Sequence, residues 1–153
     1  GLGGGFPVGA VMAKAEVGDA MVPGTHGSTF GGNPLAMRSA NAVLELLLEN
    51  DFLSNLRKMI VYFDKKMDEL IKNDMQNNPI IFAKKGSGML RGFQLNEDVT
   101  AGDFSNIARE KSLLLVGAAE NTIRLLPPLN TSKEEVDNAF DILNDIVLEL
   151  KKT

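Results

Sequence analysis

The sequence predicts an α/β chain whose last part, from residue 79 onward, is a small α+β domain. Three observations lead to this fold class. Apolar residues recur at helical spacing between residues 52 and 71, short apolar runs alternate with helical patterns after residue 79, and a glycine-rich loop precedes a helix start in the first third. Strand and helix periodicities that follow one another in this way are typical of mixed folds.

The first third, residues 1–50, is expected to be the edge of a larger domain. Val8 to Val17 is a mostly apolar stretch and predicts a buried strand. A polar, glycine-rich loop follows at Gly24 to Pro34, and Asn33 with Pro34 is a favourable start for a helix. The apolar face of that helix would contain Leu35, Ala36, Ala40, Val43, Leu44, Leu47 and Leu48.

Residues 51–78 are expected to form a long linking helix and a boundary. Apolar side chains recur here every three or four residues, which predicts an amphipathic helix. They are Phe52, Leu56, Met59, Ile60, Phe63, Met67, Leu70 and Ile71. The polar stretch from Asn73 to Pro79 would end this part of the chain.

Residues 79–153 would form the small α+β domain. Four strands are expected, at residues 80–83, 89–95, 113–116 and 122–126. Thr100 with Asp103 predicts a capped helix that continues to Lys111, and Thr131 with Glu134 predicts a capping box for a last helix. The apolar face of the last helix would contain Val136, Ala139, Phe140, Leu143, Ile146, Val147 and Leu150.

Composition excludes several functional classes. The 153 residues carry a net charge of −4 with acids and bases interspersed, so a nucleic-acid partner is not expected. The chain has no cysteine and a single histidine, His26, which argues against disulfides, thiolate sites and histidine metal clusters. No membrane span or signal peptide is indicated, and we expect a cytoplasmic location with no membrane partner.

The hydroxyls of Ser28 and Thr29 stand between glycines, close to a helix start. They could satisfy local backbone groups in an ordinary turn, or they could bind an anion together with free backbone N–H groups. His26 is expected to be a structural residue of the same polar loop. Lys14 is expected to be a solvated surface lysine.

Two arginines lie in apolar strand patterns. Arg124, within Ile123 to Leu126, would need a partner if it were buried, because an unpaired buried charge is costly. That partner could be an acidic side chain in a structural salt bridge or the carboxylate of a ligand. Arg91 alternates with apolar neighbours and is expected to point to the solvent side of its strand.

Three stretches together resemble the class III pyridoxal-phosphate aminotransferases, and most closely the acetylornithine aminotransferases. They are Gly1 to Ala10, Gly24 to Met37 and Ile123 to Leu129, and their order and spacing agree as well. The resemblance covers essentially the whole chain. It implies the C-terminal part of a fold-type I transferase, with an edge of the large domain, a linking helix and a small domain.

The resemblance also implies roles for single residues. Thr29 matches a threonine that reaches the cofactor phosphate of the other subunit, and Ser28 matches a residue that lines that neighbour's substrate pocket. Arg124 matches the arginine that binds the substrate α-carboxylate. The Schiff-base lysine of the family would precede Gly1, so no catalytic residue and no metal ligand is expected within this chain.

The implied parent is a homodimer with pyridoxal 5′-phosphate and small amino-acid substrates. It would convert N-acetylornithine and 2-oxoglutarate to N-acetylglutamate 5-semialdehyde and glutamate in arginine biosynthesis, while the chain alone would be inactive and bind the cofactor weakly. Alternatives are transamination of succinylornithine, ornithine or 4-aminobutyrate, a non-enzymatic module that binds an anion or a partner, and a structural half that folds only beside the rest. Residues 1–32 would depart from their conformation in the parent.

Overall fold

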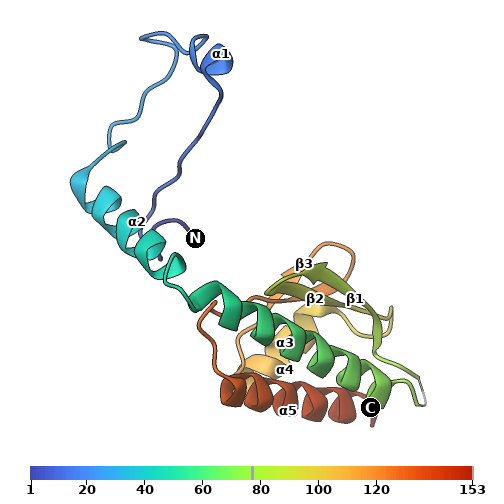
Figure 1. The fold of residues 1–153 in the computed structure, drawn as a ribbon. Coiled ribbons are helices and arrows are strands. Elements are labelled where there is room, and N and C mark those ends of the chain that lie inside the picture. Colours follow the sequence, from blue (N-terminus) through green and yellow to red (C-terminus); the bar gives the residue numbers. More distant parts are fainter. Residues whose placement is uncertain (77, 153) are drawn as a thin grey trace. The chain divides into compact units, whose positions relative to one another are not determined.

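The computed structural model describes residues 1–76 and 78–152 and divides the chain into two compact units (Figure 1). One unit is Gly1–Leu53 and the other is Ser54–Thr153. Within the described residues, no helix is both long and apolar enough to cross a membrane.

The first unit holds two helices, α1 (Ala15–Gly18) and α2 (Pro34–Leu47). The predicted start of α2 is confirmed, because the Asn33 side chain accepts a hydrogen bond from the Ala36 backbone N–H at 2.9 Å and Pro34 occupies the first turn. Of the apolar residues in this unit, only Ala36 and Ala40 of α2 belong to the buried set. The unit therefore has almost no core of its own.

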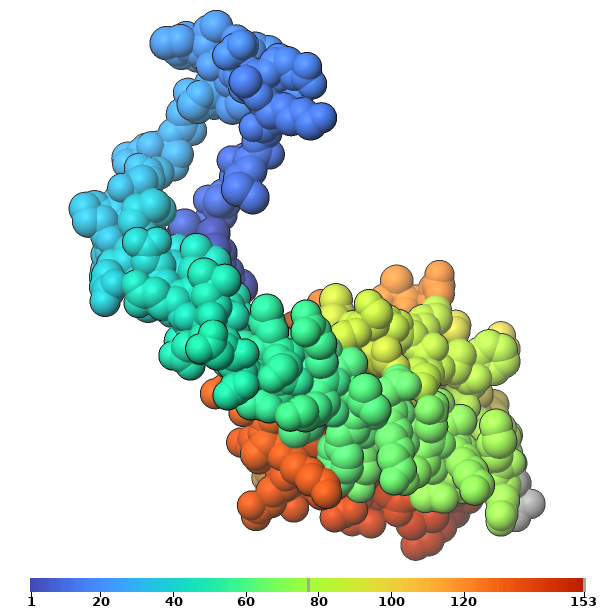
Figure 2. Space-filling view, in the orientation of Figure 1, coloured from blue at the N-terminus to red at the C-terminus, as the bar shows by residue number. Residues whose placement is uncertain are grey.

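The strand expected from Val8 to Val17 is not present. Residues 7–14 have no regular structure, α1 follows directly, and Val11 and Met12 are 88% and 96% exposed. Figure 2 shows open space between the two arms of the loop that contains this stretch. A strand needs a neighbouring strand to take up its backbone hydrogen bonds, and the described residues of this unit offer none.

The second unit is a four-stranded antiparallel sheet with helices packed on one face (Figure 1). The strand order is β1-β2-β4-β3, and the strands are β1 (Ile81–Ser87), β2 (Leu90–Leu95), β3 (Val116–Ala118) and β4 (Thr122–Leu125). The helices are α3 (Phe52–Asp74), α4 (Ala101–Glu110) and α5 (Lys133–Leu150). The predicted α+β architecture is confirmed for this part of the chain.

A continuous core lies between the sheet and the helices. Phe93 and Ile123 point into it from neighbouring positions of β2 and β4 and are fully buried. Helix α3 contributes Phe63, whose ring meets Phe140 of α5 edge to face at 5.2 Å between centroids. The predicted apolar face of α5 is largely confirmed, since Val136, Phe140, Leu143, Ile146 and Val147 are all buried.

Several predicted boundaries in this unit are wrong by a few residues. The first strand extends to Ser87, because Gly86 adopts a positive φ of 85° at the end of a tight β1–β2 hairpin. The third strand begins only at Val116, where pairing with Arg124 starts. The capping box of α5 is formed by Ser132 and Glu135, one residue later than expected. Thr100 caps α4 as predicted.

A buried ion pair joins the end of α3 to the end of α5. The Asp74 side chain is 1% exposed, accepts the Ile81 backbone N–H at 2.6 Å and lies 2.8 Å from Lys151 Nζ. Lys151 also donates to the backbone carbonyls of Asp74 and Gln76. One carboxylate thus joins two helix ends and the start of β1. One of its oxygens accepts the Ile81 N–H, and the other, which has no hydrogen-bond partner among the described residues, is compensated by the charge of Lys151.

Candidate functional site

The face of the sheet that carries no helices holds the candidate site residue Arg124. Side chains alternate along a strand, so the residues paired with Arg124 lie on its face. The register pairs Arg124 with Gly92 on one side and with Val116 on the other, and Gly92 is paired in turn with Lys85. We call this surface the outer face of the sheet.

Arg124 is exposed, so the condition under which its charge would need a partner is not met. Its neighbours in β4, Ile123 and Leu125, are buried on the opposite face, which is why the local sequence is apolar. Within residues 1–76 and 78–152, the guanidinium has no acidic partner, so the structural salt bridge considered from the sequence is absent. A free guanidinium offers five N–H donors in a planar fork that suits a carboxylate.

A shallow hollow of about 210 Å³ opens on the outer face beside Arg124. Gly92 lies in its floor, between Lys85 on one side and Arg124 on the other. A Cβ atom at Gly92 would lie 2.7 Å from Thr122 Cγ2 and 2.9 Å from the Ile123 carbonyl oxygen, so no larger residue fits. The glycine lets the Thr122 side chain and the Ile123 carbonyl of β4 lie close against β2 between the two cations.

Lys85 forms an ion pair with Glu120 across the outer face. The pair joins β1 to the β3–β4 turn, and its hydrogen bond holds the pKa of Glu120 below its usual range. The sequence analysis missed both residues. The available signal was Gly92 itself, because a glycine inside a strand often marks a site where another group approaches closely.

Arg91 does not point to solvent, and that prediction is wrong. Its side chain is only 10% exposed and forms an ion pair with Asp64 of α3. It also donates to the Gly86 carbonyl at 3.1 Å and contacts Met67 Sδ at 3.4 Å. The alternation of polar and apolar residues in this strand assigned Arg91 to the wrong face. An arginine can lie on the core face because its long apolar stem packs against the core while its charged head reaches an acid at the edge.

Ser28 and Thr29 lie in the exposed loop of the first unit. Within the described residues, neither hydroxyl has a hydrogen-bond partner, whereas Thr25 in the same loop donates to the Val22 carbonyl at 2.7 Å. Gly32 adopts a positive φ of 70° just before the Asn33 cap. The two hydroxyls are therefore free to bind a group from outside this unit.

His26 and Lys14 are exposed, as expected for surface residues. The part of the chain that the structure describes holds no cluster of three histidine, aspartate or glutamate side chains suited to a metal ion. Arg124 lies in one unit, and Ser28 and Thr29 lie in the other.

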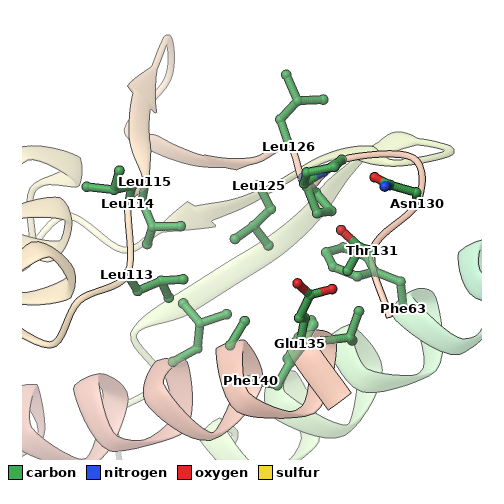
Figure 3. Close-up of a pocket in the computed structure, with 15 residues that line it drawn as sticks. Phe63, Leu113, Leu114, Leu115, Leu125, Leu126, Asn130, Thr131, Glu135 and Phe140 are labelled. Atoms are coloured by element: carbon green, nitrogen blue, oxygen red, sulfur yellow. The ribbon is translucent and has the colours of Figure 1, made fainter. Parts of the chain in front are cut away.

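A larger cavity of about 350 Å³ lies on the helix side of the sheet (Figure 3). Its walls are mostly apolar and include Phe63, Leu113, Leu125 and Phe140, while Leu126 points away from it in the close-up. The Glu135 carboxylate at its edge already accepts the Ser132 backbone N–H at 2.7 Å. This cavity offers no free charged group, in contrast to the outer face.

Comparison with known proteins gives consistent relatives. An acetylornithine aminotransferase of Bradyrhizobium diazoefficiens is 40% identical over 90% of this chain and 33% of its own length. The acetylornithine aminotransferase of Oceanobacillus iheyensis is 37% identical over 98% of this chain and 36% of its own. The chain thus spans about a third of the length of these relatives.

Solved structures agree with these sequence relatives. Ornithine δ-aminotransferase of Plasmodium falciparum matches with a TM-score of 0.81 and 28% identity, over 92% of this chain and 36% of that one. Acetylornithine aminotransferase of Elizabethkingia anophelis matches with a TM-score of 0.76 and 30% identity, over 90% and 36% of the two chains. The aminotransferase class-III family model matches residues 1–147. The chain belongs to the class-III aminotransferase family.

Proposed function

We propose that the protein containing this chain is a pyridoxal-phosphate-dependent acetylornithine aminotransferase. It would act as a cytoplasmic homodimer in arginine biosynthesis and transfer the amino group of N-acetylornithine to 2-oxoglutarate. The observation that carries the proposal is the exposed guanidinium of Arg124, which has no acidic partner among the described residues, in a chain of this family.

Arg124 is proposed to bind the α-carboxylate of the amino-acid substrate. Two parallel N–H···O bonds from a planar guanidinium fix both the position and the orientation of a carboxylate. In the half of the reaction that interconverts 2-oxoglutarate and glutamate, whose amino group is on Cα, that orientation determines where the hydrogen on Cα points, and a bond aligned for reaction contributes to the rate. Arg124 would therefore act in binding and in alignment.

Thr29 is proposed to bind the cofactor phosphate across the dimer interface, with Ser28 lining the neighbour's substrate pocket. The free Thr29 hydroxyl and the open, glycine-rich loop fit a phosphate group, which needs donors and close backbone approach. When bound, pyridoxal phosphate supplies the electron sink for the amino-acid chemistry. We also propose that residues 1–50 belong to the large domain, that residues 51–78 form the linking helix and boundary, and that residues 79–153 form the small domain.

The test is a transamination assay on the full-length protein that contains this chain. We expect turnover of N-acetylornithine with 2-oxoglutarate, and a drop in kcat/KM of at least about tenfold in Arg124→Gln, the loss expected for a charged hydrogen-bonded pair. Lys152→Gln, which removes a charge from an exposed residue elsewhere, is the control and should keep the activity. Unchanged kinetics in Arg124→Gln would refute the assignment of Arg124.

Ornithine is a second candidate amino donor. The observation in its favour is the TM-score of 0.81 to an ornithine δ-aminotransferase. N-acetylornithine carries an acetyl group on its α-amine, which removes that charge, whereas the δ-amine that is transferred is the same in both donors, so their kcat/KM values in the same assay decide between them.

A further inference from the structure

We propose that Lys85 is a positioning residue that holds Glu120 away from Arg124 and so keeps the Arg124 guanidinium free for a substrate carboxylate. This inference rests on the proposed carboxylate-binding role of Arg124. It concerns the Lys85–Glu120 ion pair, which lies on the same outer face of the sheet.

The strand register brings the two cations, Lys85 and Arg124, close together. Lys85, Gly92 and Arg124 occupy one row across β1, β2 and β4. With strands about 4.8 Å apart, the Cα atoms of the two cations are about 10 Å apart. Lys85 reaches Glu120 in the β3–β4 turn, so its side chain extends over β2.

Glu120 is the acid placed to compete with a ligand for Arg124. It stands four residues before Arg124, in the β3–β4 turn, where Glu120 and Asn121 have positive φ values of 56° and 47°. The two Cα atoms are therefore closer than the roughly 13 Å of an extended chain, and two long side chains can close that separation. The turn backbone is fixed, because the Asn121 side chain donates to the Asn96 and Val99 carbonyls at 2.8 Å each. A change of partner from Lys85 to Arg124 therefore requires only a rotation of the Glu120 side chain.

In the structure Glu120 is paired with Lys85, and Arg124 has no acidic partner among the described residues. The lowering of the Glu120 pKa comes from Lys85 and would be lost with it, but an ordinary glutamate is also ionised near neutral pH, so the acid would remain a competitor. Removing Lys85 would then let Glu120 turn toward the guanidinium and occupy its donors.

The test is a double-mutant cycle on the full-length protein that contains this chain. Glutarate is titrated into the protein and its binding is measured by isothermal titration calorimetry. We expect Lys85→Gln to weaken glutarate binding about fivefold, the worth of an exposed ion pair at Arg124. Adding Glu120→Gln should restore the affinity to within about twofold of wild type. Lys85→Arg, which keeps the pair, should bind like wild type and shows that the position tolerates substitution.

Lys111→Gln is the matched control. Lys111 pairs with Glu149, and the two side chains are 34% and 54% exposed, against 36% and 70% for Lys85 and Glu120. It removes the same charge from a similar pair away from the outer face, and glutarate binding should not change.

Two results would overturn the inference. If Lys85→Gln binds glutarate like wild type, Glu120 does not compete for Arg124. If Glu120→Gln does not restore binding, Lys85 acts through its own charge rather than by positioning Glu120. Because glutarate binding is measured without turnover, these results are independent of the transamination assay, whose failure would refute the proposed function alone.

Discussion

The two units of this chain contain similar apolar residues and use them in opposite ways. In Ser54–Thr153, Phe93, Phe104 and Met67 are fully buried within one continuous core. In Gly1–Leu53, Phe30 and Leu48 are 80% and 78% exposed. Both units contain capped helices, so local helix signals do not explain the difference.

The comparison teaches that helix caps and apolar periodicity specify elements, whereas a core requires faces that can meet. Unit Ser54–Thr153 has a sheet with one apolar face and three helices to cover it. Unit Gly1–Leu53 has a single long helix and an exposed loop. Apolar patches left open in this way mark surfaces that contact other protein.

The largest effect is expected from a pair of phenylalanine truncations, one in each unit. Phe93→Ala would leave a cavity in the core and lower the unfolding free energy by about 3–5 kcal/mol. Phe30→Ala should change it by less than about 0.5 kcal/mol, because the ring is exposed. Urea denaturation followed by circular dichroism measures both, and equal losses would contradict the contrast between the units.

The next effect concerns the buried carboxylate of Asp74. Asp74→Ala would leave Lys151 without its counter-ion and the Ile81 N–H without its acceptor, so we expect a loss of about 3 kcal/mol. Asp145→Ala, on an exposed part of α5, is the control and should cost little. The measurement is urea denaturation, and a urea midpoint of Asp74→Ala equal to that of Asp145→Ala would show that the ion pair adds nothing to stability.

A smaller effect compares the helix caps of the two units. Ser132→Ala removes the cap of α5, which is part of the core, and should lower the unfolding free energy by about 1 kcal/mol. Asn33→Ala removes the cap of α2 and should lower helix content while the midpoint of the core stays in place. Thr131→Ala, at the residue where the capping box was expected, should hardly change the unfolding free energy. If it lowers this free energy as much as Ser132→Ala does, Ser132 is not the cap that stabilises α5.

The smallest effect is a pH dependence confined to the second unit. Hydrogen bonds from Tyr62 and Lys66 hold the pKa of Asp137 below its usual range. A carboxyl whose pKa is lowered by folding stabilises the folded state above its unfolded pKa, and this contribution is lost as the pH falls through the folded value. Asp137→Asn should therefore flatten the acid side of the stability profile in thermal melts.

Asp141→Asn is the control for this pH profile, since Asp141 is exposed on the same helix. It should leave the acid side of the profile unchanged. An equally steep acid loss in wild type and Asp137→Asn would show that other carboxyls cause it.

The sequence was sufficient for most of the second unit, because its signals are local and agree with its packing. The spacing in α3 and α5 and the cap at Thr100 each predict the observed element. The predicted strand in the first third failed because strand formation depends on a neighbouring strand, which the residues from Val8 to Val17 cannot reveal.

The candidate site shows the same limit. Arg124 was selected as a candidate site residue because of its apolar neighbours in the sequence, but its exposure depends on which face of the sheet the helices cover. Arg91 was placed on the wrong face because its partner Asp64 lies far away in the sequence. The pair of Lys85 and Glu120 is set by strand register, and neither residue stands out in its own segment.

The late position of α5 has a consequence for how this chain folds during synthesis. The helix contributes five buried residues to the core, and it is the last of the described elements to be made. Until it emerges from the ribosome, the part of the core that α5 covers stays open on the nascent chain, although α3 and α4 have already been made. We therefore expect chaperones that bind exposed apolar segments to associate with ribosome-bound chains that stop before residue 133, and to release them once α5 is available.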